Sequence, residues 1–378
     1  MSHIVGTVQP APPGTVIGPD SGQPPSSSNT WALNFAHTPA PGGSKFVMLH
    51  FVAAGFPASN RLEVDLGYDT DIFTAADGPD FWTRPINIFN LPTQQVPIRY
   101  VTNGAATGSV TLDQYGRGER HTKDPNNTSS LFDSFSNCDP FLGDSPYIEP
   151  DYAQFWLCHG LPPNWENMAC TTAAGDIRRT VAPGVGMVLH VDFVPTVGFI
   201  LSTCTVTLVG PDLVITAGHC MADPTEDGKS SSIIFGYATN CDGTRPAGYS
   251  PQVCKVTQVL NQRYADGSSN DYCLMRIKVP PGGLGIAPIV QRTSLPSVGE
   301  QVFGIHHPNG AVKKLSIPHP NFTTVTSSSS SGIGVDLDVA GGSSGSGLFD
   351  SSGQIIGVLS NGLACGLSYF PKIGRAHV

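Results

Sequence analysis

The sequence predicts an all-β protein in which a small β-sandwich domain precedes a larger β domain. Its 378 residues include 43 glycines and 33 prolines, a composition typical of short strands joined by many tight turns. A single hydrophobic core stops growing near roughly 250 residues, so a chain of this length is expected to form two domains. Apolar runs are short throughout, and none is long enough to span a bilayer.

The N-terminal part divides into three segments. Residues 1–30 are rich in proline, glycine and serine and are expected to be disordered. Residues 31–119 contain strand-like runs, and the alternation of apolar and polar residues at 62–66 predicts a sheet with one solvated face. This region resembles the CUB-type β modules attached to extracellular proteases. Residues 120–150 are expected to connect it to the second domain, 151–372.

Charge excludes several kinds of partner. Only 13% of the residues are charged, the net charge is −9 and no basic cluster is present, so the expected partners are proteins or peptides rather than nucleic acid or an acidic membrane surface. Four acidic residues on one predicted strand and the turn after it could bind calcium, but carboxylates on a solvated surface are the preferred explanation. These residues are Glu63, Asp65, Asp69 and Asp71. We therefore expect no metal and no organic cofactor.

Three segments of the second domain carry residues suited to nucleophilic catalysis. They are Thr216-Ala217-Gly218-His219-Cys220, Asn270-Asp271-Tyr272-Cys273-Leu274 and Gly341-Gly342-Ser343-Ser344-Gly345-Ser346-Gly347. A serine hydroxyl is a weak nucleophile at neutral pH, so it needs an imidazole to accept its proton and a carboxylate to orient that imidazole. Ser344, His219 and Asp271 would supply these three groups.

Each segment alone also has a simpler explanation. A run of glycine and serine is typical of a flexible linker, a lone histidine is more often structural, and a lone aspartate usually lies in a solvated loop. The surrounding patterns favour a site. Predicted strands at 205–209 and 213–216 lead directly into His219, and further strand-like runs follow the serine segment. Asp271 opens an apolar run, where its carboxylate can persist only if it is hydrogen-bonded.

With these motifs, the chain resembles the trypsin-like serine proteases of the chymotrypsin fold, and most closely their lysyl-endopeptidase branch. The resemblance covers about Cys158 to Cys365, and Ile305-His306-His307-Pro308-Asn309-Gly310 with Lys313-Lys314 looks like a segment of that branch. It implies a chymotrypsin-like double β-barrel and a secreted endopeptidase that cleaves after lysine or arginine through an acyl-enzyme intermediate. A solvated loop explains the two histidines of this segment equally well, so we assign them no catalytic role.

The resemblance also implies supporting residues around the serine. The backbone N–H groups of Gly342 and Ser344 are expected to form an oxyanion hole for the charged oxygen of the tetrahedral intermediate. The segment Ser360-Asn361-Gly362 matches the family's substrate-binding segment, where an extended peptide can pair as an added strand. Ser360 is also expected to hydrogen-bond the buried Asp271.

Cysteine usage indicates an oxidising compartment, since the chain has 9 cysteines, most of them in the second domain. Their spacing along the chain pairs Cys204 with Cys220 across the hairpin before His219, and the resemblance implies two further disulfides, Cys170–Cys241 and Cys158–Cys365. Cys273 is expected to be a buried free thiol in a core strand. No partner is assigned to Cys138 or Cys254.

Both ends of the sequence differ from what a secreted protease should have. Residues 1–6 lack the apolar core of a signal peptide, and we attribute this to an incomplete gene model. Residues 373–378 are what the start of a widely used sequencing adapter encodes, so the natural sequence is expected to depart from this one after about Lys372 and to continue through a strand and a terminal helix. No acidic residue follows Asp350, so the carboxylate that would bind a lysine or arginine side chain is expected in that continuation.

Two expectations concern activity as a whole. Many trypsin-like zymogens have an aspartate where this chain has Ser343, and use it to receive a new N-terminal ammonium group. A neutral hydroxyl cannot compensate a buried charge, so activation is not expected to depend on such an amine. The alternative function is a catalytically silent, protease-like binding protein whose N-terminal β module carries the function.

Overall fold

The computed structural model describes residues 2–39, 46–86, 91–104, 106–118, 164–194, 198–221, 227–244, 246–264, 271–317, 320–330, 332–361 and 373–377. The chain forms two compact units. The N-terminal unit comprises His3–Thr122 and Val191–Leu201, and the C-terminal unit comprises Met1–Ser2, Lys123–His190 and Ser202–Val378. No helix in the described part of the chain is both long and apolar enough to cross a membrane.

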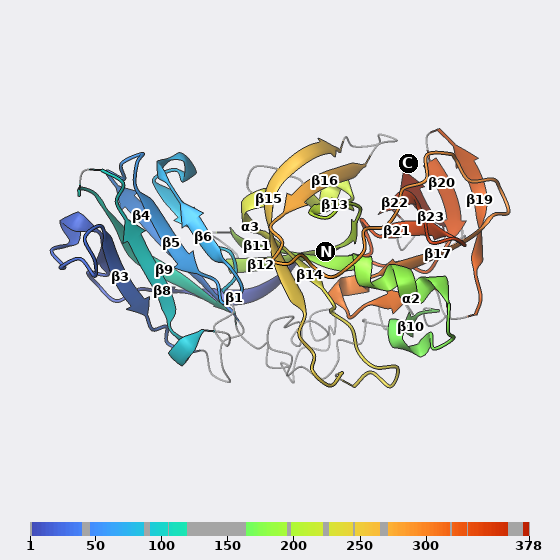
Figure 1. Cartoon of the computed structure of the whole chain (residues 1–378), viewed down its shortest axis with the longest axis horizontal. Coiled ribbons are helices and arrows are strands. Elements are labelled where there is room, and N and C mark those ends of the chain that lie inside the picture. The colour runs from blue at the N-terminus through green and yellow to red at the C-terminus, as the bar shows by residue number, and fades with distance from the viewer. Residues whose placement is uncertain are drawn as a thin grey trace. The chain divides into compact units, whose positions relative to one another are not determined.

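The N-terminal unit consists of two antiparallel sheets around one hydrophobic core (Figure 1). One sheet has the order β1 (Ser2–Pro10), β9 (Ser109–Gly118), β4 (Val47–Ala54) and β7 (Asp80–Trp82), with β2 (Val16–Ile17) also paired to β9. The other has the order β3 (Thr30–Phe35), β8 (Val96–Val101), β5 (Arg61–Asp65) and β6 (Thr70–Phe73). Alternate residues of β5, Leu62 and Val64, are fully buried, as the alternation in the sequence predicts.

The first thirty residues are more ordered than their composition suggests. Residues 6–10 of β1 pair in register with residues 114–118 of β9, and β2 pairs with the same strand. The composition of residues 1–30 as a whole predicts disorder, but its prolines and serines are concentrated after residue 10. The residues before them include the β-branched Ile4, Val5, Thr7 and Val8. These residues favour an extended backbone, and β9 supplies the pairing partners of residues 6–10.

A second segment of the chain, Val191–Leu201, completes the N-terminal unit. Its Phe199 is fully buried and contacts Trp82 edge to face, with ring centroids 5.2 Å apart. Gly116 on β9 allows this packing, because a Cβ at that position would lie 2.0 Å from the ring of Phe199. The unit is therefore not built from the N-terminal 119 residues alone.

The C-terminal unit begins with a closed six-stranded barrel. Its order is β11 (Val185–Val194), β14 (Ser231–Phe235), β15 (Gln252–Arg263), β16 (Tyr272–Ile277), β13 (Leu213–Thr216) and β12 (Gly198–Leu208), and pairing of β11 with β12 closes the ring. Register shifts after Val256 and Val259 bend the long strand β15 around the barrel. The interior is apolar and includes Val206, Val214, Ile233 and Met275.

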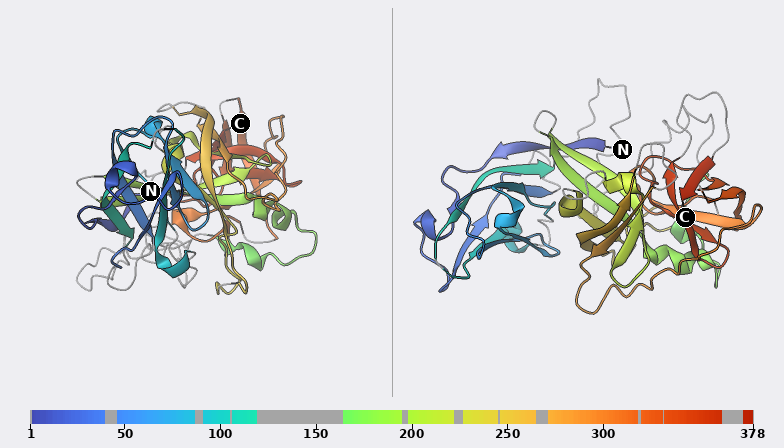
Figure 2. Two further views of the ribbon diagram at one scale, coloured as in Figure 1. Left: turned by 60° about the vertical axis from the view of Figure 1, so that its left-hand side comes forward. Right: turned by 90° about the horizontal axis from the view of Figure 1, so that it is seen from above.

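A second six-stranded barrel lies next to the first in Figures 1 and 2. Its order is β17 (Gln301–His306), β19 (Thr323–Ser329), β20 (Gly332–Asp336), β23 (Ile373–His377), β22 (Ile355–Asn361) and β21 (Gly347–Asp350), and β17 pairs with β21 to close it. β18 (Lys314–Leu315) and β10 (Glu166–Asn167) extend the sheet beyond β17. Two antiparallel six-stranded barrels confirm the predicted all-β, chymotrypsin-like double barrel preceded by a β-sandwich.

The sixth strand of the second barrel, β23, is formed by the last residues of the chain that the structure describes. β23 pairs with β20 through residues 333–336 and with β22 through Val358, Leu359 and Asn361. Ladder hydrogen bonds join backbone groups, so this position in the ring depends little on the identity of the side chains that fill it.

Helices within the described ranges are few and short. The α-helical turns are α2 (Ile177–Val181) and α3 (Asp227–Ser230), and the 3₁₀ turns are η1 (Pro19–Ser21), η2 (Ala75–Asp77), η4 (Pro92–Gln94), η6 (Met168–Cys170), η7 (Ala182–Gly184), η8 (Gly218–Met221) and η9 (Pro308–Gly310). Among these, η8 carries His219, and η9 follows the two histidines of the 305–310 segment.

Candidate active site

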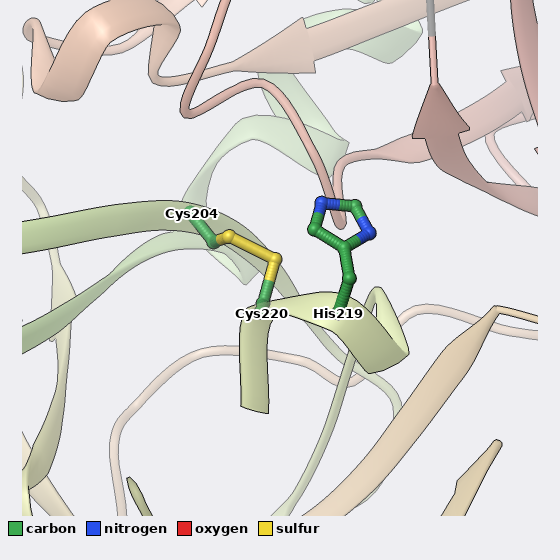
Figure 3. Close-up of side chains that lie close together, drawn as sticks. All are labelled: Cys204, His219 and Cys220. Carbon is green, nitrogen blue, oxygen red and sulfur yellow. A yellow bond between two sulfur atoms is a disulfide. The ribbon is translucent and has the colours of Figure 1, made fainter. Parts of the chain in front are cut away.

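His219 lies on the turn η8, directly after the buried strand β13. The turn passes close to the end of β15, and a Cβ at Gly218 would lie only 2.1 Å from the carbonyl oxygen of Arg263. A glycine is therefore required where the sequence motif has one. The disulfide Cys204–Cys220 fastens the same turn to β12, and Figure 3 shows the imidazole projecting from the turn beside this bond.

Asp271 precedes β16 and uses both carboxylate oxygens on His219. Its Oδ2 accepts a hydrogen bond from Nδ1 of His219 at 2.7 Å, and its Oδ1 accepts one from the backbone N–H of His219 at 2.9 Å. The hydroxyl of Ser360 donates to Oδ2 as well. Burial alone would raise the pKa of Asp271, but the hydrogen bonds from His219 and Ser360 outweigh it and hold the pKa below its ordinary value. The carboxylate therefore remains ionised and fixes both the position and the tautomer of the imidazole.

Ser344 lies in the turn between β20 and β21 and is partly exposed. Its carbonyl oxygen accepts a hydrogen bond from the backbone N–H of Thr205 on β12, at 2.8 Å. The glycine after it is equally constrained, because a Cβ at Gly345 would lie 2.0 Å from the hydroxyl of Thr216. The ends of β12 and β13 thus hold both the turn with His219 and the turn with Ser344. Within the described residues, no hydrogen bond joins Ser344 to His219.

Along the serine turn, backbone N–H groups that donate to a carbonyl alternate with N–H groups that have no acceptor among the described residues. The N–H groups of Ser343 and Gly345 donate to carbonyl oxygens of Ala340 and Leu359, at 3.0 and 2.7 Å. Those of Gly342 and Ser344 donate to none of the residues that the structure describes. Gly342 has φ 86°, a left-handed conformation that favours glycine. The two free donors are the two that the sequence predicts for an oxyanion hole.

The predicted substrate-binding segment is described in part. Ser360 is buried near the end of β22 and contacts Asp271, as the sequence predicts. Asn361 is the last residue of β22 and pairs with Arg375. Gly362 lies outside the described residues.

Two of the three expected disulfides are present, Cys204–Cys220 and Cys170–Cys241. The proposed pair Cys158–Cys365 lies outside the described residues, as does Cys138. Cys273 and Cys254 are both buried and belong to neither disulfide. The Cys170–Cys241 bond joins η6 to the loop after β14, whereas the Cys204–Cys220 bond joins β12 to η8.

The possible metal ligands considered among the described residues already have protein partners. The described residues contain one close group of possible ligands, Cys204, His219 and Cys220, but its two sulfurs are bonded to each other and leave no thiolate for an ion. The carboxylates considered for calcium have protein partners. Glu63 pairs with Arg61 at 2.7 Å and Asp71 with Arg84 at 2.5 Å.

Some residues around the serine turn carry no signal in the sequence. Thr205 donates from its hydroxyl to the carbonyl oxygen of Gly342 at 2.9 Å, although the two are 137 residues apart. His306, to which the sequence assigns only a family resemblance, is fully buried and bonded to Ser343 at 2.7 Å. The solvated-loop explanation for His306 and His307 is wrong, because both side chains are buried and hydrogen-bonded to residues of the segment 311–316.

A double barrel with a His–Asp pair beside a glycine-bounded serine turn defines a serine protease of the chymotrypsin fold. Residues 167–369 match the family described as lysyl endopeptidase, C-terminal domain. This match covers more than half of the chain, and the chain belongs to that family.

The chain is also similar to a solved structure. It is described as a thermostable serine protease AL20 from an extremophilic microorganism, and it is 18% identical over 52% of this chain and 92% of its own, with a TM-score of 0.37. No curated protein sequence matches the chain significantly.

Proposed function

We propose that this chain is a secreted serine endopeptidase in which Ser344 is the nucleophile, His219 the general base and Asp271 the residue that orients it. The observation that carries the proposal is the pair of hydrogen bonds between Asp271 and His219. Because the ionised carboxylate accepts from Nδ1, the proton of the neutral imidazole stays on that nitrogen. Nε2 is then the unprotonated nitrogen and can accept the proton of the serine hydroxyl.

The reaction follows from these assignments. Oγ of Ser344 attacks the peptide carbonyl carbon while Nε2 of His219 takes the hydroxyl proton, and the former carbonyl oxygen becomes an oxyanion held by the N–H groups of Gly342 and Ser344. His219 then gives the proton to the leaving amine, the C–N bond breaks, and an acyl-enzyme remains. A water molecule, deprotonated by His219, hydrolyses this ester and restores the free serine. No metal or organic cofactor takes part in these steps.

The substrate is proposed to bind as an extended peptide along 360–362, with lysine or arginine before the cleaved bond. Support comes from the match to the lysyl endopeptidase family and from the resemblance of Ser360-Asn361-Gly362 to the substrate-binding segment of such proteases. A cationic side chain in a closed pocket requires a carboxylate partner. Asp350 does not fill that role, since it is buried and accepts a hydrogen bond from Arg292. Secretion is proposed from the two disulfides, which persist only in an oxidising compartment.

A fluorophosphonate probe tests the proposal, since it reacts with an activated serine and forms a stable adduct. We expect the full chain to be labelled on Ser344 and Ser344→Ala to abolish both labelling and peptide hydrolysis. The matched control is Ser346→Ala, two residues away in the same turn, which should still be labelled. Peptide substrates that differ only in Lys, Arg or Leu before the cleaved bond then test the specificity.

Other outcomes of this experiment are equally clear. An adduct on Ser346 would show that the nucleophile is misassigned within the turn. A folded chain that is not labelled at all would reject the proposed activity in favour of a protease-like binding protein.

A further inference from the structure

The residue next to the nucleophile is held by a buried chain of hydrogen bonds. The hydroxyl of Ser343 lies 2.7 Å from Nδ1 of His306, and Nε2 of His306 lies 3.1 Å from the hydroxyl of Ser316. Ser316 in turn lies 3.4 Å from the carbonyl oxygen of Asp338. The exposed fractions of Ser343, His306 and Ser316 are 0, 1 and 1%, so these bonds are shielded from water.

The donors and acceptors of this chain fit one arrangement best. The Ser343 hydroxyl already accepts a hydrogen bond from the backbone N–H of Ala340, at 3.1 Å. If Ser343 donates to Nδ1, then Nε2–H of His306 donates to Ser316, and Ser316 donates to the carbonyl of Asp338. Every proton in the chain then has an acceptor. The opposite tautomer would leave the Ser343 hydroxyl proton without one among the described residues, which is costly in a buried site.

The next residue, His307, also supports the serine turn, through Thr205. The backbone N–H of His307 donates to the hydroxyl of Thr205 at 2.9 Å, and that hydroxyl donates to the carbonyl oxygen of Gly342 at 2.9 Å. His306 therefore fixes the side chain of Ser343, while His307 fixes the peptide before it through Thr205. The peptide between Gly342 and Ser343 is thereby held through its carbonyl, and the N–H groups of Gly342 and Ser344 donate to none of the described residues.

We propose that His306 is a positioning residue, which as a neutral imidazole holds Ser343 and thereby keeps the turn of Ser344 in its reactive shape. This inference rests on the proposed function, because the turn matters only if Ser344 is the nucleophile. Its support is the geometry above, in which hydrogen bonds between neutral groups alone define the turn. A turn of this kind needs no ion pair and no new chain terminus to form.

Burial keeps His306 in the required state. Its environment, together with the nearby positive charge of Lys314, lowers the pKa of His306 to about 3. Trp165 covers one side of the imidazole, with ring centroids 5.4 Å apart and planes at 81°, and its indole N–H donates to the same Asp338 carbonyl at 2.7 Å. The imidazole is therefore neutral at neutral pH and takes up a proton only in acid.

Kinetics of fluorophosphonate labelling in the full chain test the inference. His306→Leu removes both bonds and leaves the Ser343 hydroxyl unsatisfied, so we expect the labelling rate constant and kcat to fall about 10- to 100-fold, with KM changed less than about twofold. His306→Asn places an amide oxygen near the position of Nδ1 and should recover most of the rate. Ser343→Ala combined with His306→Leu should be no slower than the slower single variant, because both changes remove one shared bond.

The matched control is a buried histidine outside this chain. His190 on β11 lies 3.1 Å from the hydroxyl of Ser231 and has no bond to the serine turn among the described contacts. His190→Leu should lower Tm but leave the labelling rate unchanged below Tm. NMR of 15N-labelled histidine in the wild-type chain gives a separate readout, in which His306 should be protonated on Nε2 and should not titrate between about pH 5 and 8.

The outcomes separate this inference from the proposed function. Wild type that labels, together with His306→Leu labelling at the wild-type rate, would overturn the positioning role and leave the nucleophile assignment intact. A His306 imidazole protonated on Nδ1 would overturn it as well. Failure of the wild-type chain to label would reject the proposed function, and the positioning role with it.

Discussion

At the scale of single residues, the candidate site depends on how one carboxylate is shared. Asp271 binds the backbone and the imidazole of the same residue, His219, so the ring can neither shift along the turn nor rotate about its χ angles without losing a charge-assisted hydrogen bond. Ser360 binds the remaining lone-pair direction of Oδ2. A buried carboxylate with these partners is both ionised and fixed in orientation.

Asp271→Asn should lower kcat about 10⁴-fold with little change in fold. The amide oxygen would accept from the backbone N–H of His219, so the NH₂ group would face Nδ1, and the imidazole would carry its proton on Nε2, where it cannot act as a base. Steady-state kinetics and the melting temperature of the variant check this. Ser360→Thr keeps the hydroxyl and is the control. Activity in Asp271→Asn within tenfold of wild type would show that Asp271 is not the orienting residue.

Two buried neutral histidines should make the protein sensitive to mild acid. The pKa values of His306 and His307 are lowered to about 3, in both cases mainly by burial. The unfolded chain takes up these protons near pH 6.5, while the folded chain does so only near pH 3, so stability is complete above pH 6.5 and declines as the pH falls below it. Each histidine contributes a slope approaching about 1.4 kcal/mol per pH unit.

Urea unfolding between about pH 5 and 6.5 measures this slope, in a window where ordinary carboxylates are still ionised in both states. His307→Gln should be less stable overall and should lose about one proton of pH dependence. An unchanged slope in the variant would show that His307 is protonated in the folded chain.

At the scale of elements, the ends of two strands carry the site. β12 supplies Thr205, whose N–H, hydroxyl and carbonyl bind Ser344, Gly342 and the Thr216 hydroxyl respectively. β13 leads into the turn of His219. Both strands belong to the first barrel and the serine turn leads into β21 of the second, so the hydrogen bonds of Thr205 hold the two turns together.

The two disulfides should have different functional effects. Replacing Cys204 and Cys220 by serine opens a short loop and releases η8 from β12, so we expect a loss of about 3 kcal/mol in unfolding free energy and a fall in kcat, because His219 is on that turn. Replacing Cys170 and Cys241 opens a longer loop and should lower the unfolding free energy by about 4 kcal/mol, but kcat should stay within about twofold, because no described contact joins either residue to His219, Asp271 or Ser344. Chemical unfolding and kinetics at one temperature distinguish the two variants. An equal fall in kcat in both variants would contradict the expectation that the Cys204–Cys220 bond specifically positions His219.

At the scale of the whole molecule, the segment around Val181 is ordered and buried in the uncut chain. Val181 and Ala182 are buried, and the carbonyl oxygen of Ala182 accepts a hydrogen bond from Nζ of the buried Lys313 at 2.6 Å. Arg178 just before them is fixed by Asp176 and is 2% exposed. A protease cutting here would have to unfold this segment first.

We therefore expect the intact chain to react with a fluorophosphonate probe without prior cleavage. Intact-mass measurement of the labelled protein should show one adduct on the uncut polypeptide. Arg179 is the exposed basic residue of the segment, so Arg179→Gln removes its most accessible tryptic bond and should label at the wild-type rate. Labelling that appears only after a cut near Val181 would refute preformation of the turn.

The sequence by itself determined the fold class, the three residues proposed for the chemistry and the Cys204–Cys220 pair. Each of these depends on a short segment of sequence, such as alternating apolar residues, Gly218-His219-Cys220 or the glycines around Ser344. In such segments the local backbone requirements allow few other residue types or conformations. The sequence did not reveal that residues 6–10 form a strand, because the composition of residues 1–30 as a whole hides a short β-branched run and the partner strand lies more than a hundred residues away.

Only the tertiary structure decided which side chains support the serine turn. His306 and Ser343 are separated by 37 residues, and Thr205 and Gly342 by 137, so neither pair has a spacing that a sequence pattern could detect. Their contact depends on β17 lying against the serine turn and on the first barrel meeting the second. A buried histidine and an exposed one have the same letter in the sequence, and only the closed barrel, which removes water from His306, makes it a neutral hydrogen-bonding partner.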